Sequence, residues 1–420
     1  MKRFLTVLLC LLPAVLLRAQ EEPAPKTGWA FSPLPDVSYD SDQGVKLGAF
    51  ANIFYYGDGS VYPNFLHHVA VAGAWASKGS WYLHGMFDSS SLIPGVRFTA
   101  SLTYRDVSAN NFYGFNGIAS PYDKELDMNR LTRTAYYSNH RRMIRGAAVF
   151  QREGKNRLNW MGGAVFRHIR LQDCTLENYD SGNSLYMAYR SAGLVRPDEA
   201  AGGASLELKG GVTYDSRDVE LFPGKGIYGE LYLNGNVDLS HGKYHYAQLV
   251  GHFRHFVPIV RDRVVFAYHL GLQHQFLGEM PFYNLTELST LLYQYEEFEG
   301  LGSRYSVRGF RYNRIAAAGL AWSNIELRAT VANFTLFKQR VSLVLMPFVD
   351  LAAITRPFRL DEQRALPGFY QPNRVPIMVS GGVGGKIHIN ANTILGVDFG
   401  KALDPQLSDF TISMASTYVF

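Results

Sequence analysis

The stretch "IYGELYLNGNVDL", residues 227 to 239, alternates between two kinds of side chain. Its odd positions, among them Ile227, Leu231 and Leu233, are all apolar or glycine, whereas the even positions include Glu230 and Asp238. A period of two is typical of a β-strand with one apolar face and one polar face. Residues 96–105 and 206–217 follow the same rule. The sequence therefore predicts strands with two chemically different faces.

These alternating runs are long, and their length separates two β architectures. Strands of soluble sandwiches are usually about 5 to 6 residues long, and here the runs reach a dozen or more. Nothing else in the chain is available to cover so much apolar surface. In a closed membrane barrel, lipid covers the apolar faces, the polar faces line a lumen, and every backbone group finds a partner. The sequence predicts an all-β, transmembrane, antiparallel β-barrel.

Strand counting tests this prediction, because single-chain bacterial barrels normally have an even number of strands. Sixteen segments qualify: 33–40, 45–56, 67–77, 80–89, 96–108, 133–152, 157–173, 204–217, 227–239, 244–258, 263–277, 317–331, 341–353, 376–390, 393–401 and 409–420. Alternate connections are short, and those on the other side include long segments at 109–132, 174–203, 278–316 and 354–375. This asymmetry is typical of outer-membrane barrels, whose long loops face outward.

The two ends of the chain carry further signals. Residues 1–20 combine a basic start with a short apolar run and are predicted to be a secretory signal peptide, with a retained anchor as the alternative. Residues 21–32 are predicted to form a short periplasmic tail, and residues 33–420 the barrel. The ending "TISMASTYVF" resembles the assembly signal of outer-membrane barrels, and Phe410 directly before it is in phase with Ile412, Met414, Tyr418 and Phe420.

Charge and cysteine content exclude other classes. Removal of the signal would leave basic and acidic residues nearly balanced, so no basic surface for nucleic acid is expected. Cys10 would leave with the signal, and Cys174 would have no disulfide partner. We predict the outer membrane of a Gram-negative bacterium as the location, with its lipid as a partner.

The hexapeptide "SVRGFR" at 306–311 lies in the long loop between the eleventh and twelfth predicted strands. It occurs in a series of ordered motifs: "YDSRD" at 214–218, "FPGKG" at 222–226, "EMPFYN" at 279–284, "NIELR" at 324–328 and "PFVD" at 347–350. In this order the motifs resemble those of the outer-membrane assembly factor superfamily, the BamA and TamA type of sixteen-stranded barrel, also called the bacterial surface antigen domain. The resemblance covers most of residues 31–420.

The resemblance implies that the loop with Val307, Arg308, Gly309 and Phe310 folds back into the lumen, where the arginine meets acidic residues of the following strands. The alternation independently turns Glu326 and Asp350 inward, so both are predicted partners of Arg308. An alternative is a solvated loop whose charge is offset by Glu296, Glu297 and Glu299. Two residues after Asp350, this chain has Ala352 where the family usually has glycine.

The family resemblance also implies a mechanism at the seam between the first and last strands. A poorly paired seam exposes backbone groups that can template an incoming strand. Pro33 and Pro35 in the first strand and Phe420 in the last are the predicted seam residues, although prolines are equally ordinary in an edge strand. Most family members carry periplasmic POTRA domains before the barrel, and about a dozen residues are too few for such a domain. We expect a POTRA-less member.

Three functions remain open. The first is assistance in inserting or translocating outer-membrane or surface proteins, with client barrels or a partner that supplies periplasmic domains. The second is a loop-gated pore for small solutes, and the third is a structural subunit of a larger outer-membrane complex. No enzymatic activity, catalytic residue, metal or cofactor is predicted. The chain has no G-x-S-x-G motif, and His252 and His255 lie three apart on a strand, so they point to opposite faces.

Overall fold

The computed structural model describes residues 25–420 except 41–43, 63, 128–134, 178, 181, 292–299, 303–305, 338, 373–374, 391–392, 409 and 416–417. The predicted signal peptide and residues 21–24 of the predicted tail lie outside the described residues. Over the described part of the chain, sixteen antiparallel strands form one sheet in which each strand pairs with the next. The predicted all-β fold with sixteen strands is confirmed.

The strands have the following bounds: β1 Trp29–Asp40, β2 Gly44–Tyr55, β3 His67–Ala76, β4 Trp81–Ile93, β5 Val96–Asn111, β6 Ser138–Arg152, β7 Leu158–Asp173, β8 Gly202–Asp215, β9 Gly226–Asp238, β10 Tyr246–Val260, β11 Val264–Gly278, β12 Gly319–Leu336, β13 Gln339–Arg356, β14 Met378–Ile389, β15 Thr393–Ala402 and β16 Thr411–Ala415. The helical segments are short: α2 Leu185–Ser191, α3 Leu360–Arg364 and the 3-10 turns η2 Gly117–Ala119, η3 Lys124–Leu126, η4 Lys155–Arg157 and η5 Phe282–Asn284. Among the described residues, no helix has the length and apolar character needed to cross a membrane.

Several predicted boundaries differ from the structure; the twelfth strand, for example, ends at Leu336 rather than at residue 331. The barrel begins at Trp29 rather than at residue 33, because Trp29 and Phe31 continue the outward phase of β1. The sixth strand begins at Ser138 rather than at residue 133, since the chain turns at residues 136–137. The last strand ends at Ala415 rather than at residue 420.

The alternation along β9 shows which face is covered by protein. Leu231 and Leu233 are each 53% exposed, whereas Glu230, Tyr232 and Asn234 are 3%, 1% and 1% exposed. Polar side chains are thus buried inside and large apolar side chains lie outside, the reverse of a soluble protein. An apolar outer face of this kind is suited to contact with lipid, and the polar inner face lines a lumen.

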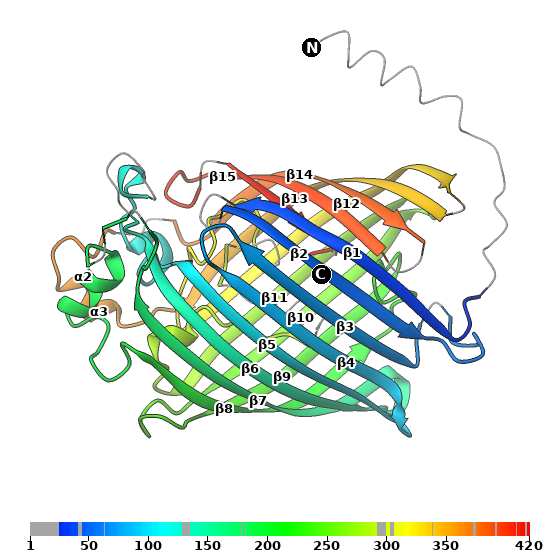
Figure 1. Cartoon of the computed structure of the whole chain (residues 1–420), viewed down its shortest axis with the longest axis horizontal. Coiled ribbons are helices and arrows are strands. Elements are labelled where there is room, and N and C mark those ends of the chain that lie inside the picture. The colour runs from blue at the N-terminus through cyan, green and yellow to red at the C-terminus, as the bar shows by residue number, and fades with distance from the viewer. Residues whose placement is uncertain are drawn as a thin grey trace, which may run out of the picture.

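The sheet curls around one axis until its two edges approach each other, as Figure 1 shows. Ser32 Oγ in β1 lies 3.5 Å from Thr393 Oγ1 in β15. Among the described residues, no hydrogen-bonded ladder joins β1 to β16. The wall is therefore continuous except at this seam.

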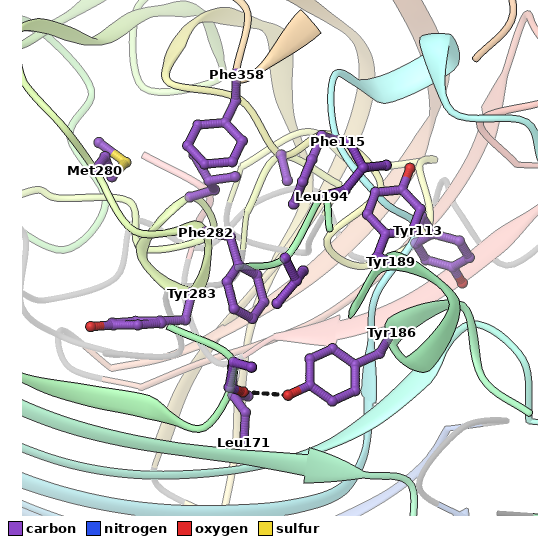
Figure 2. Packing of buried hydrophobic residues seen from close by; sticks show 14 of the residues in the cluster. Tyr113, Phe115, Leu171, Tyr186, Tyr189, Leu194, Met280, Phe282, Tyr283 and Phe358 are labelled. Atoms are coloured by element: carbon purple, nitrogen blue, oxygen red, sulfur yellow. Dashed lines mark hydrogen bonds between the residues drawn. The ribbon is translucent and has the colours of Figure 1, made fainter. Parts of the chain in front are cut away.

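The long connections gather at one end of the sheet and pack into an apolar cluster, which we call the outer cap (Figure 2). It combines loop 112–137, loop 174–201 with α2, loop 279–318 and loop 357–377. Phe112 makes edge-to-face contacts with Tyr186, Tyr189 and Phe282. Tyr186 also donates a hydrogen bond to the backbone oxygen of Ala200. The loops at this end are thus a folded, packed layer.

Candidate functional site

Loop 279–318 carries the site, because it turns back from the outer cap into the lumen. Arg308 lies at the bottom of this turn, and its side chain is 1% exposed. Its Nε and Nη2 donate to Asp350 Oδ2 and Oδ1 at 3.0 and 2.9 Å, and its backbone N–H donates to Asp350 Oδ2 at 2.8 Å. Its Nη1 forms an ion pair with Glu326 Oε1 at 2.8 Å. The structure thus brings together the three residues predicted to interact.

The buried charges around Arg308 balance. Arg328 Nε donates to Glu326 Oε2 at 2.7 Å, and Lys386 Nζ donates to Asp398 Oδ2 at 2.9 Å. Three cations therefore face three carboxylates: Arg308, Arg328 and Lys386 against Glu326, Asp350 and Asp398. Buried charges are tolerated when they are paired and hydrogen-bonded in this way. The alternative of a solvated loop does not fit this burial of Arg308, and its Glu296, Glu297 and Glu299 lie outside the described residues.

The guanidinium of Arg308 also stacks on an aromatic ring, with its Cζ 3.7 Å from the centre of the Phe348 ring. Stacking and two-pronged hydrogen bonding to a carboxylate both depend on a planar fork, which lysine does not offer. Phe348 lies two residues before Asp350 on the inner face of β13. Phe348 was not among the predicted site residues, although "PFVD" contains it and the alternation turns it inward.

Gly309 explains why the motif needs glycine after the arginine. Its φ is +84°, a conformation that side-chain-bearing residues adopt at a cost. A Cβ at this position would lie 2.9 Å from Ser380 Cβ and 3.0 Å from Lys401 N. The loop backbone therefore touches β14 and β15 directly. Across this contact, a Cβ on Gly400 would come within 2.8 Å of Gly309 N.

The rest of the motif anchors the loop by apolar packing. Val307 and Phe310 are 0% and 2% exposed and belong to one buried cluster with Trp322 and Leu407. Ala352, which replaces the usual glycine of the family, belongs to the same cluster and is 2% exposed. Its methyl group is therefore part of the packing around the loop.

Two further arginines of this loop, Arg311 and Arg314, bind the outer cap. Arg314 donates to the backbone oxygens of Gly117 and Ser120 at 2.8 and 3.1 Å. The guanidinium carbon of Arg311 lies 4.0 Å from the centre of the Tyr122 ring. The loop is thus held at both ends, by charge in the lumen and by the cap above it.

The C-terminal residues lie inside the lumen, which corrects the expected outward phase of Tyr418 and Phe420. Phe410, Ile412 and Met414 are exposed as predicted, but Tyr418 and Phe420 are 5% and 6% exposed. The guanidinium carbon of Arg328 lies 3.8 Å from the Tyr418 ring centre and 4.9 Å from that of Phe420. Arg328 Nη2 also donates to the backbone oxygen of Phe420 at 3.1 Å. These interactions favour the inward path over continuation of β16.

Glu326 consequently contacts two partners of different origin. One of its carboxylate oxygens pairs with Arg308 from the loop, and the other accepts from Arg328, which binds the C-terminal residues. Arg328 was part of the quoted "NIELR" motif, and its even position shares the inner face with Glu326. The alternation along β12 could have predicted that Arg328 points inward. The inward path of the C-terminus, in contrast, has no signal in the sequence.

The predicted seam prolines lie on the free edge of β1. Gly28 N donates to Gly57 O, and Tyr56 N donates to Gly28 O. In an antiparallel ladder, alternate residues bond to the same neighbour, so the even residues of β1 bond to β2. The odd residues direct their backbone groups toward the seam, and Pro33 and Pro35 are both odd. Each proline lacks the backbone N–H that would otherwise donate a hydrogen bond from β1 to β16.

A second segment enters the lumen from the end with short connections. The turn 216–225 brings Glu220 to Arg97 of β5, whose Nη1 donates to Glu220 Oε1 at 2.9 Å. Burial raises the pKa of Glu220, but the charge and hydrogen bonds of Arg97 together with the charge of Arg217 outweigh it and hold the pKa below its usual value. Phe222 of the same turn packs beside Tyr418 and His388. The turn therefore covers the C-terminal residues from below.

In the described part of the chain, no three His, Cys, Asp or Glu side chains are grouped so that they could hold a metal ion. His252 is buried and stacks on His269, whereas His255 contacts the Tyr268 hydroxyl on the other face. The predicted opposite orientation of these two histidines is confirmed.

The fold and the buried contacts of Arg308 together define a sixteen-stranded barrel whose lumen is occupied by its own loop. The chain belongs to the Omp85 superfamily, since the model of the Omp85 superfamily domain matches residues 72–373. This is the superfamily indicated by the ordered motifs.

Solved structures have the same fold. BamA from Haemophilus ducreyi lacking POTRA domains 1-3 is 16% identical, with a TM-score of 0.52 over 93% of this chain and 71% of that chain. CdiB from Escherichia coli is 12% identical, with a TM-score of 0.53 over 92% of this chain and 61% of that chain. At these identities the similarity concerns the fold. No curated protein sequence matches the chain.

Proposed function

We propose that this protein assists the insertion or translocation of outer-membrane or surface proteins in the outer membrane of a Gram-negative bacterium. Client chains would engage the seam beside β1, while the loop with Arg308 stays seated in the lumen. The proposed activity is non-enzymatic and uses backbone hydrogen bonds at a strand edge, as in other cases of strand addition. Partners would be membrane lipid, client barrels and proteins that present them.

The incomplete seam is the observation that carries this proposal. β1 is twelve residues long and β16 five, and no ladder between them is present among the described residues. Below the end of β16, the Ser32 side chain of β1 approaches Thr393 of β15. Since unpaired strand edges template further strands, this edge is suited to receive one.

The prolines limit where a client strand could bind. Pro33 and Pro35 offer no N–H to the seam, so an incoming strand would lose two hydrogen bonds, each worth about 1 kcal/mol. The same loss applies to β16. Pairing of β1 with β16 and pairing of β1 with a client strand are therefore weakened by the same amount. The prolines give the closed seam no advantage, and they make it easier to open.

A cross-seam disulfide tests the proposal. Replacing Ser32 and Thr393 with cysteine places two thiols where the hydroxyl oxygens are 3.5 Å apart. The matched control pairs Ser32→Cys with Asn52→Cys, because Ser32 and Asn52 already face each other between β1 and β2. We expect the cross-seam disulfide alone to reduce levels of outer-membrane proteins, measured by quantitative mass spectrometry, and a reductant to restore them. Normal levels with the seam locked would contradict the proposal.

A pore for small solutes is the second candidate, favoured by the wall below the loop. Within the described structure, the side-chain amides of Asn234 and Asn236 have no hydrogen-bond partner although they are buried. Buried polar groups of this kind normally bind water, which indicates a hydrated lumen. If the protein is a pore, shortening loop 279–318 around Arg308 raises conductance in planar bilayers. Equal conductance with and without the loop would contradict this function.

A further inference from the structure

An apolar groove runs along the lipid-facing wall of β7 to β11, on the half nearer the short connections. Its volume is about 410 Å³, and its outward-facing lining includes Leu158, Tyr214, Leu231, Phe253 and Leu270. All five of these side chains are exposed on the outer face. The groove is therefore open to the membrane and separate from the lumen.

Two glycines create the groove. Gly229 in β9 and Gly251 in β10 lie in its lining, between Leu231, Phe253 and Leu270. A Cβ at Gly229 would meet no atom nearer than 3.9 Å, and a Cβ at Gly251 would first meet Leu231 Cδ1 at 3.4 Å. The missing side chains leave a depression in a wall that is otherwise covered by leucine and aromatic groups. An apolar depression that is open to the membrane suits a hydrocarbon chain.

Three short connections, 153–157, 216–225 and 261–263, lie on the side of the wall nearer this groove and carry exposed basic residues. Arg157 directly precedes Leu158, and Lys225 directly precedes β9. The exposed basic residues of these three connections and of the adjoining end of β6 form what we call the basic rim: Arg152, Lys155, Arg157, Lys225, Arg261 and Arg263. Among the described residues of these connections, the exposed acids are Glu153, Asp218 and Asp262. The rim is thus positive.

Two acids of these connections already have partners. Asp218 Oδ1 accepts from the backbone N–H groups of Val219 and Gly224 at 2.9 and 3.0 Å. Asp262 Oδ2 lies 3.6 Å from Arg261 Nε. Arg157 and Lys225 are therefore well placed to attract an anionic group at the membrane surface. Arginine and lysine are both common ligands of phosphate.

From the groove and the basic rim together, we infer that this wall binds one anionic phospholipid of the inner leaflet. One acyl chain lies over Gly229 and Gly251, and the headgroup phosphate lies against Arg157 and Lys225. A strand rises about 3.3 Å per residue, so Gly229 is roughly 10 Å along β9 from its first residue. This depth lies within the reach of an acyl chain anchored at the surface. The site is independent of the seam and of Arg308.

Native mass spectrometry of the whole protein tests this inference with two probe lipids. Dioleoyl phosphatidylglycerol and dioleoyl phosphatidylcholine have the same acyl chains and differ in net headgroup charge. Offered in equal amounts, the first is expected to remain bound to the wild-type protein as the protein leaves the detergent micelle. Equal retention of both lipids by the wild type would overturn the inference.

Two variants separate the groove from the rim. Gly229→Leu fills the groove and is expected to abolish retention of the lipid. Gly235→Leu is the matched control, because it lies on the same strand and face but outside the groove, and a Cβ there meets nothing within 4 Å. The double variant Arg157→Gln, Lys225→Gln is expected to lose the preference for phosphatidylglycerol.

Heat-modifiable migration in gel electrophoresis verifies that each variant remains a folded barrel. If Gly229→Leu and Gly235→Leu retain lipid equally, the groove is not the site. If the double variant keeps the preference, the phosphate is not bound by this rim. Either result would overturn the inference.

Discussion

Replacing Arg308 with alanine removes the cation that two buried carboxylates share. Asp350 would lose both guanidinium hydrogen bonds and keep the backbone N–H of residue 308, and Glu326 would keep Arg328. Removing one member of a buried, hydrogen-bonded charge pair typically costs about 3 to 5 kcal/mol. Asp350 is 0% exposed, so water cannot readily solvate the charge that remains. We expect Arg308→Ala to lower the free energy of unfolding by an amount in this range.

Arg311→Ala is the matched control, because Arg311 is an arginine of the same loop whose side chain is less deeply buried. Its Nε lies 3.7 Å from Asp127 Oδ2, its side chain is 15% exposed, and it stacks on Tyr122. Partly exposed pairs and stacking of this kind are each worth about 1 kcal/mol or less. Arg308→Ala should therefore cost several times more stability than Arg311→Ala.

Urea unfolding of the purified protein in lipid vesicles measures both values. Trp322 is buried in the same cluster as Val307 and Phe310, so its fluorescence also reports whether the loop is seated. Adding Asp350→Asn to Arg308→Ala should recover part of the lost stability, because it removes the unpaired charge. If Arg308→Ala is no more costly than Arg311→Ala, the argument that buried charge holds the loop is refuted.

Three further predictions concern the loop backbone, the C-terminus and the outer cap. Gly309→Ala should cost about 1 to 3 kcal/mol in the same unfolding assay, because its φ is +84° and a Cβ would press on Ser380. Arg328→Ala should speed trimming of the C-terminus by carboxypeptidase, and an unchanged rate would speak against the guanidinium contacts as the restraint. In the cap, the hydrogen bond from Lys243 outweighs burial and lowers the pKa of Asp198 to about 2 from an ordinary value of 3.8. Since the folded pKa is depressed, this contact stabilises the loops above about pH 4 and is lost as the pH falls toward 2. Hydrogen exchange of loop 239–245 should show this loss in the wild type, and no such step in Asp198→Asn.

The inward residues of the site were predictable because a strand has a simple period. Once β12 and β13 are placed, Glu326 and Asp350 must point to the same face as every second residue around them. The ordered motifs then located Arg308 between two strands of known order. Phe348 and Arg328 obey the same phase and could have been named by the same rule.

The C-terminal residues show where prediction from the period-two alternation fails. Tyr418 and Phe420 continue the phase of Phe410, Ile412 and Met414 in the sequence, and the pattern alone predicts that all five face lipid. The cost of leaving the ladder is offset by contacts with Arg328, which lies about ninety residues earlier. Such a contact depends on the curled shape of the wall and has no local signal.

The sequence by itself therefore determined the sixteen strands, their alternating faces, the superfamily and the inward position of the two acids that meet Arg308. All of these depend on local period or on ordered motifs. Only the tertiary structure decided that the loop touches β14 and β15 through Gly309, and that the C-terminus turns inward. It also decided that the prolines face the seam and that Gly229 and Gly251 open a groove beside basic turns. These features arise from surfaces that meet across the barrel or between neighbouring strands, and a linear pattern carries no information about which surfaces those are.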